Sequence, residues 1–147
     1  MKALFCIAAL CAAPLAHAHI TVAPATAPAG AYQILVFKVG HGCAGSATTG
    51  ITVQLPEGVT AKPMPKPGWT IALAPREIGW RGGPLPDAYY DEFTLQAKLP
   101  DTPGRLVFKV GQQCEKGRMD WADTTPESKT PAPVLEVTPA AMPMHHH

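Results

Sequence analysis

The sequence lacks the motifs that accompany most hydrolytic and phosphate chemistry. It has no glycine-rich phosphate-binding loop, no His-Glu-x-x-His pair and no Gly-x-Ser-x-Gly nucleophile elbow. Ser46 and Ser128 have no plausible general base nearby in the sequence. Hydrolytic catalysis is therefore unsupported, and we expect a binding protein rather than an enzyme.

The chain also has no excess of charge and no long apolar run in its body. It carries 12 Lys and Arg residues against 11 Asp and Glu residues. A nearly neutral protein lacks the electrostatic attraction that nucleic acids and anionic lipids require. After residue 18, no segment is apolar over the roughly 20 residues that a membrane-spanning helix needs. We therefore expect neither nucleic acid nor membrane as a partner.

The first eighteen residues have the pattern of a secretory signal peptide. The charged start Met1-Lys2 precedes an apolar stretch that ends at Leu15, and the segment closes on small residues in Ala16-His-Ala18. The alternative is a membrane anchor, but the apolar stretch is too short to span about 30 Å of hydrocarbon as a helix. We expect cleavage after Ala18, export to the periplasm, and a remaining chain of one-domain size.

Cysteine is scarce in the part of the chain that would remain. Cys6 and Cys11 leave with the signal peptide, whereas Cys43 and Cys114 stay. Two cysteines in an oxidising compartment usually form one disulfide. Closing a loop of about 70 residues would stabilise the fold by a few kcal/mol, because it restricts the unfolded chain.

The pattern of the remaining chain predicts an all-β fold. Proline and glycine interrupt it every eight to twelve residues, and no window shows a sustained helical period. Apolar and polar residues alternate in the runs between the breaks, as in half-buried strands. Short strands at even spacing predict an antiparallel β-sandwich over residues 19–137. The expected strands are Tyr32–Val39, Ile51–Leu55, Thr70–Leu73, Glu92–Leu99, Leu106–Val110 and Val134–Val137.

One segment of the chain occurs twice. The nine residues Leu35–Cys43 recur as Leu106–Cys114 with seven identical positions, including the cysteine. One interpretation is two related strands that enter similar turns at the same end of the sandwich and bring both cysteines to the rim. The alternative is a chance similarity between two strand-forming segments.

Cleavage after residue 18 would make His19 the first residue of the mature protein. A terminal histidine offers its α-amine and its ring Nδ1 to the same metal ion. The reference pKa of the amine is near 8 and that of the ring near 6.5, so both lose a proton readily at neutral pH. Two nitrogens from one residue suit Cu(II). The alternative is that the position is accidental, because every exported protein begins with some residue.

Several segments taken together resemble the YcnI-like family of exported copper-binding proteins. The resemblance begins at His19-Ile-Thr-Val-Ala-Pro and covers about 105 residues in order. Single words such as Pro-Gly-Trp are weak signals, but their order and spacing are specific. The other matching segments are Gly40–Cys43, Thr49–Gly58, Pro67–Trp69, Trp80–Gly83, Tyr90–Phe93, Leu99-Pro, Gln113–Gly117 and Trp121.

The resemblance implies a fold, a metal site and partners. The fold is an immunoglobulin- or cupredoxin-like sandwich. The copper site is a one-histidine brace: the amine and ring of His19, an acidic ligand, and Trp121 beside the metal. The acid is Glu92 or Asp91; if Phe93 points inward, the strand pleat directs Glu92 outward. We favour Glu92 because its side chain is longer. Other periplasmic copper-handling proteins and inner-membrane copper importers would be the partners.

Other functions stay open on the sequence. A copper-dependent oxidase similar to polysaccharide monooxygenases would need a second histidine opposite the first, and His41 is the only other histidine in the predicted domain. Reduced Cys43 and Cys114 could form a soft Cu(I) site with His41; with the disulfide formed, His41 has no assigned role. A metal-free adhesion or interaction sandwich is the third possibility.

The end of the chain is expected to lie outside the sandwich. Residues 124–133 are polar and proline-rich, which is typical of a linker or an extended edge, and residues 138–147 are expected to be disordered. The last segment combines thioether and imidazole groups that suit Cu(I) and Cu(II) respectively. It is either a metal-collecting tail or without function. Its candidate ligands are Met142, Met144, His145, His146 and His147.

Overall fold

The computed structural model describes residues 19–125 and 127–142, and within them it contains strands and loops with no helix. The predicted signal peptide and the tail residues Met144 to His147 lie outside this range. The described residues form no helix long and apolar enough to cross a membrane. The strands are β1 (Thr21–Ala23), β2 (Thr26–Pro28), β3 (Tyr32–Val39), β4 (Thr48–Gln54), β5 (Thr60–Pro63), β6 (Trp69–Ala74), β7 (Glu77–Leu85), β8 (Asp91–Lys98), β9 (Gly104–Val107), β10 (Val110–Cys114), β11 (Arg118–Trp121) and β12 (Val134–Thr138).

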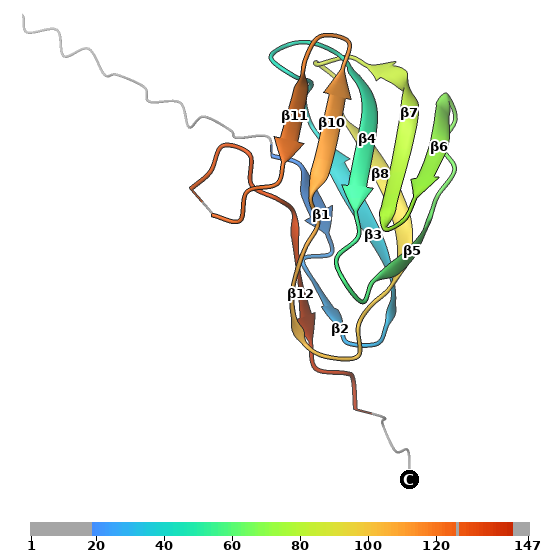
Figure 1. Ribbon diagram of the computed structural model, residues 1–147, viewed down its shortest axis with the longest axis vertical. Coiled ribbons are helices and arrows are strands. Elements are labelled where there is room, and N and C mark those ends of the chain that lie inside the picture. Colours follow the sequence, from blue (N-terminus) through green and yellow to red (C-terminus); the bar gives the residue numbers. More distant parts are fainter. Residues whose placement is uncertain (1–18, 126, 143–147) are drawn as a thin grey trace, which may run out of the picture.

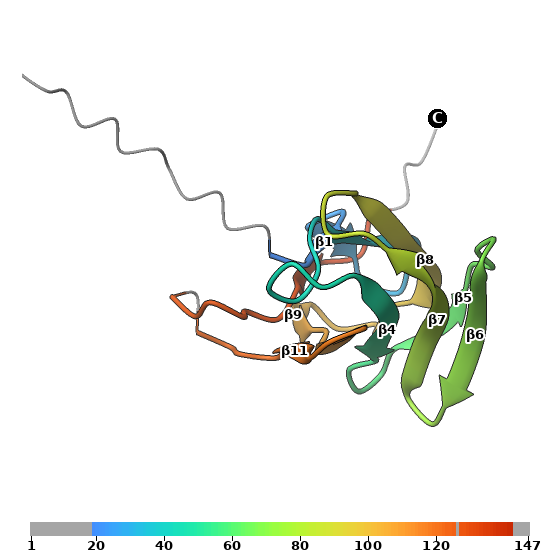
Figure 2. The same ribbon diagram turned by 90° about the horizontal axis from the view of Figure 1, so that it is seen from above.

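Two larger sheets face each other and a smaller one closes one end. The first has the strand order β1-β3-β8-β5, the second β11-β10-β4-β7-β6, and the third β2-β12-β9. Figure 1 shows the five-stranded sheet in front of the four-stranded one, and Figure 2 shows the two layers from above. Neighbouring strands are antiparallel except β2 and β12, which run parallel. The predicted antiparallel β-sandwich is therefore confirmed.

The core follows from the alternation of apolar residues along the strands. From Leu35 onward in β3 and from Phe93 onward in β8, every second side chain is buried, and Phe37 and Phe93 are partners in the register. Ile51 and Val53 of β4 point from the opposite sheet into the same space. Because side chains alternate between the two faces of a strand, one apolar set per strand is enough to fill the interior.

The repeated segment does not form two equivalent strands, so that interpretation was wrong. Its first copy lies in one continuous strand, β3, before the turn to Cys43. Its second copy is divided between β9, which pairs with β12, and β10, which pairs with β4. The break falls at Phe108, whose ring is fully buried and packs edge-on against Phe37 with centroids 5.5 Å apart. Tertiary packing thus overrides the local similarity.

The two cysteines nevertheless meet as predicted. Cys43, in the turn after β3, and Cys114, at the end of β10, form a disulfide with their Cα atoms 6.0 Å apart. Both cysteines are buried. The bridge joins the turn after β3 of the four-stranded sheet to the end of β10 of the five-stranded sheet, at one end of the sandwich.

The segment between β11 and β12 projects from the sandwich as a loop (Figure 1). Asp123 pairs with Pro131 in an isolated bridge and accepts hydrogen bonds from Ser128 and Thr130, which hold the pKa of its carboxyl below the usual value. The expected linker is therefore folded back on itself at its base. Beyond it, β12 ends at Thr138, one residue later than predicted, and Met142 is exposed.

Candidate metal centre

Two histidine rings converge on one buried tryptophan at the rim of the sandwich. Trp121 is the last residue of β11 and is 1% exposed. The centroid of the His19 ring lies 6.0 Å from that of Trp121, and the centroid of the His41 ring lies 5.8 Å from it. His19 precedes β1, whose start lies beside the end of β11 in Figure 1, and His41 follows β3. Three distant segments of the chain therefore meet here.

A buried glutamine holds this arrangement together. Gln112 of β10 is 0% exposed, and its Oε1 accepts a hydrogen bond of 2.9 Å from the indole N–H of Trp121. Its Nε2 donates to the carbonyl oxygen of His41 at 2.7 Å and to the hydroxyl of Thr48 at 2.9 Å. Because each polar atom of the buried amide has a partner, the side chain ties Trp121 and the His41 loop to the same strand.

The loop that carries His41 is fastened at two further points. The backbone N–H of Gly42 donates to Asp87 Oδ1 at 2.8 Å, and Cys43 is in the disulfide. Gly42 is required by space, because a Cβ built there would lie 1.8 Å from the carbonyl oxygen of Ser46. Sequence reasoning left His41 without a role. The repeated segment held a clue to His41. The two copies differ at two positions, and at one of them the first copy has His41 and the second has Gln112. These two residues are hydrogen-bonded to each other in the structure.

The two acidic candidates point in different directions from the start of β8. Asp91 Oδ1 forms an ion pair of 2.6 Å with Lys66, which lies beyond β5 on the side of the sheet away from β1. Glu92 is exposed, and in the register it lies level with Lys38 of β3, which is in turn level with Thr21 of β1. Phe93 is fully buried, so the expected pleat is observed. Glu92, Lys38 and Thr21 therefore lie in one row across β8, β3 and β1. Asp91 is instead paired with Lys66.

The charge of Glu92 affects the pKa of its neighbour Tyr90. The hydroxyl of Tyr90 donates a hydrogen bond to Glu92 Oε1. That hydrogen bond, helped by the negative charges of Glu92 and Asp91, raises the pKa of Tyr90 to about 12. The carboxylate keeps a second oxygen for another partner, because an ionised Glu can accept at both oxygens.

The chemical types of the side chains at this rim are suited to copper. Imidazole nitrogen suits copper, and a tryptophan face beside a cation is a favourable electrostatic contact. Within the described residues, no three His, Cys, Asp or Glu side chains are gathered as a complete metal site. A further donor is needed, and the α-amine of His19 would be one in a chain that begins at this residue. The structure thus brings His19 and Trp121 together and adds His41, while Glu92 and Asp91 lie across β3 on β8.

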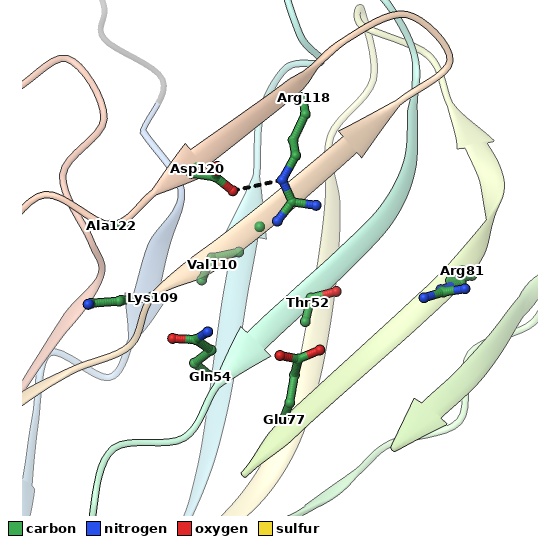
Figure 3. Close-up of a pocket in the computed structure, with 10 residues that line it drawn as sticks. Thr52, Gln54, Glu77, Arg81, Lys109, Val110, Arg118, Asp120 and Ala122 are labelled. Carbon is green, nitrogen blue, oxygen red and sulfur yellow. Dashed lines mark hydrogen bonds and ion pairs between the residues drawn. The ribbon is translucent and has the colours of Figure 1, made fainter. Parts of the chain in front are cut away.

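A separate polar groove lies on the outer face of the five-stranded sheet (Figure 3). Its volume is about 450 Å³, and its walls come from β4, β7, β10 and β11. Arg118 and Asp120 of β11 form an ion pair of 2.9 Å on this face, whereas Trp121 of the same strand points into the core. The groove and the tryptophan site therefore lie on opposite sides of one strand. Charges of both signs line the groove, so it has no clear preference for an anion or a cation.

The fold and this rim define an immunoglobulin-like β-sandwich with a histidine and tryptophan site at one end. Residues 19–76 and 70–137 match the family described as a domain of unknown function, DUF1775. The chain belongs to this family, which confirms the resemblance to the YcnI-like proteins.

One relative is named as a copper-binding protein, and similar solved structures have the same kind of fold. The chain is 24% identical over 141 residues to the copper-binding protein CutI of Bacillus subtilis (strain 168), with 90% of this chain and 68% of that protein covered. A crystal structure of an uncharacterised Nocardia farcinica protein, described as immunoglobulin-like, matches with a TM-score of 0.70 and 26% identity over 84% of this chain and 99% of that one. A type I cohesin from Pseudobacteroides cellulosolvens matches with a TM-score of 0.51 and 9% identity over 88% of this chain and 97% of that one, which bears on the fold alone.

Proposed function

We propose that this protein is a periplasmic copper-binding protein that holds Cu(II) at the rim around Trp121 and passes it to another protein. The observation that carries the proposal is the convergence of His19 and His41 on the ring of Trp121. The relative named as a copper-binding protein supports the choice of metal. The role is one of transport, chaperoning or homeostasis rather than catalysis.

The proposed coordination starts from His19. Once the signal peptide is removed, the α-amine and Nδ1 of His19 bind the same ion as a brace. Glu92 is the proposed acidic ligand, since Asp91 is paired with Lys66. Trp121 covers one face of the ion and limits the access of water, and it cannot move away because its indole N–H is held by Gln112. Few protein ligands and a rim position suit an ion that must be released to a partner.

The partners follow from this role. We propose that other periplasmic copper-handling proteins and inner-membrane copper importers exchange the ion with this protein. The open rim allows another protein to approach the metal directly. The tail residues Met142, Met144 and His145 to His147 are proposed as auxiliary collectors of copper; of these the structure describes only Met142, which is exposed.

The decisive experiment is a Cu(II) titration of protein whose N-terminus has been verified as His19 by mass spectrometry. We expect one equivalent to bind, with nitrogen couplings in the electron paramagnetic resonance spectrum. Binding should be lost in His19→Ala, because this change removes the imidazole nitrogen that closes the chelate ring with the α-amine. Tyr32→Ala is the control, since Tyr32 lies at the other end of β3 from His41. Stoichiometric, tight binding by His19→Ala would overturn the proposal.

A second candidate function rests on His41. Copper oxidases with a histidine brace use a second histidine, and here a second ring lies against the same tryptophan. Multiple turnovers of a glycan or of ascorbate by the copper-loaded protein would favour an oxidase. Binding without turnover would favour the transport role.

A further inference from the structure

We propose that His41 is a direct copper ligand, and that its Nε2 nitrogen adds a second imidazole to the ion held by His19. The inference rests on the proposed function and extends its ligand set beyond His19, Glu92 and Trp121. It starts from the position of the His41 ring, 5.8 Å from the centroid of Trp121 and tilted by 57° to it, against 6.0 Å and 54° for His19. The two imidazoles thus make nearly the same contact with one indole.

The hydrogen bonding of His41 leaves the right atom for a metal. Its Nδ1 lies 2.6 Å from the carbonyl oxygen of Gly42. A carbonyl oxygen can only accept, so Nδ1 carries the proton, and in the neutral ring the lone pair is on Nε2. Histidines that bind metals almost always donate their other ring N–H to a carbonyl, a carboxylate or water, which fixes the tautomer and raises the basicity of the ligand nitrogen. His41 has this arrangement before any metal is bound.

The backbone under His41 is also held in place. Its carbonyl oxygen accepts the hydrogen bond from Gln112, whose Oε1 at the same time accepts from Trp121. The next two residues are fastened by Asp87 and by the disulfide to Cys114. A ring packed on a fixed indole by a fixed loop loses little conformational freedom when it binds an ion.

The ion would also be within reach of a partner. His41 is half-buried and borders an open groove of about 730 Å³, which continues past Asp87 and Met119. The groove runs along the disulfide turn and the turn between β10 and β11. An ion bound by His41 would therefore lie beside this groove, where an incoming ligand can approach it.

The first test counts imidazoles in the wild-type protein. Electron spin echo envelope modulation of the Cu(II)-loaded protein, with its N-terminus verified as His19, detects the remote ring nitrogen of each bound imidazole. We expect two coordinated imidazoles in the wild-type protein and one in His41→Phe. Phenylalanine keeps a ring against Trp121 but has no ligand nitrogen, so this variant separates ligation from packing. Thermal unfolding of the copper-free variants checks that the fold is retained.

The second test measures affinity by competition with a chelator. Loss of outer-shell partners costs roughly 10- to 100-fold in metal affinity, so loss of a ligand should raise the Kd at least about tenfold. We expect this for both His41→Phe and His41→Ala, and no change for Tyr32→Ala.

The outcomes separate the two proposals. One coordinated imidazole in the wild-type protein, with unchanged affinity in His41→Phe and binding lost in His19→Ala, would refute the role of His41 and leave the copper function standing. Absence of tight binding to the wild-type protein would overturn both.

Discussion

Replacement of Gln112 by leucine tests whether the buried amide holds the rim together. Leucine has a similar volume but no polar atoms, so Gln112→Leu removes three side-chain hydrogen bonds at once. The indole N–H of Trp121, 1% exposed, is left without its acceptor, and Thr48, also buried, loses a donor. The carbonyl of His41 lies in a half-buried residue and can bind water instead.

The expected cost follows from the buried groups. An unsatisfied buried donor or acceptor costs about 1–3 kcal/mol, whereas a group that regains water costs little. The lost partners of Trp121 and Thr48 together predict a decrease of about 2–6 kcal/mol in the free energy of unfolding. Guanidinium denaturation followed by circular dichroism measures it. Gln113→Leu is the matched control: Gln113 is the next residue and is exposed, so the carbonyls of Cys114 and Gly117 to which its amide donates can bind water instead, and its change should stay within about 1 kcal/mol.

A double-mutant cycle tests how much of the lost stability comes from the hydrogen bond between Gln112 and Trp121. In the Gln112→Leu background, Trp121→Phe removes the orphaned indole donor and should cost less than it does in the wild-type protein. The predicted coupling is about 1–2 kcal/mol, in the range measured for contacting residues. A Gln112→Leu protein as stable as the Gln113→Leu control, or strict additivity with Trp121→Phe, would refute the reasoning.

The remaining predictions concern the disulfide and the acidic start of β8. Replacing Cys43 and Cys114 by serine opens a loop with a sequence separation of 71 and should lower the free energy of unfolding by about 4 kcal/mol; a loss below about 1 kcal/mol would contradict the loop-entropy argument. Tyr90 should titrate near pH 12 in ultraviolet absorbance, and Glu92→Gln should lower its pKa toward 10, with no such change in Asp120→Asn. Because the folded pKa of Tyr90 is raised, this stabilisation is present below pH 10 and is lost as the pH rises toward 12. A Tyr90 midpoint that does not move in Glu92→Gln would disprove the link.

The choice between the two acidic candidates illustrates a limit of strand periodicity. The pleat correctly predicted that Phe93 points inward and Glu92 outward. It could not predict that Lys66, more than twenty residues earlier, pairs with Asp91. That ion pair depends on the order of strands in the sheet, which the alternation of one strand does not contain.

The sequence by itself determined the features that depend on neighbours in the chain. Alternation between residues i and i+2 predicted β3, β4, β6, β8 and β12, and the two remaining cysteines predicted the Cys43–Cys114 bridge. The order of matched segments identified the family. The proposals that begin from His19 as the first residue of the mature chain also come from the sequence, and they await the titration.

Only the tertiary structure decided which segments meet. Identical residues form one strand in Leu35–Val39 and are split between two sheets in Leu106–Val110, where Phe108 packs in the core against Phe37. The sequence offered His41 only as an alternative ligand, and its place beside His19 and Trp121 emerged when its loop was seen to be held against Trp121 by Gln112, which is 71 residues away in the chain. Local patterns specify faces and turns, whereas contacts over such separations arise from the packing of the whole sandwich, and the proposed metal site is made of contacts of this second kind.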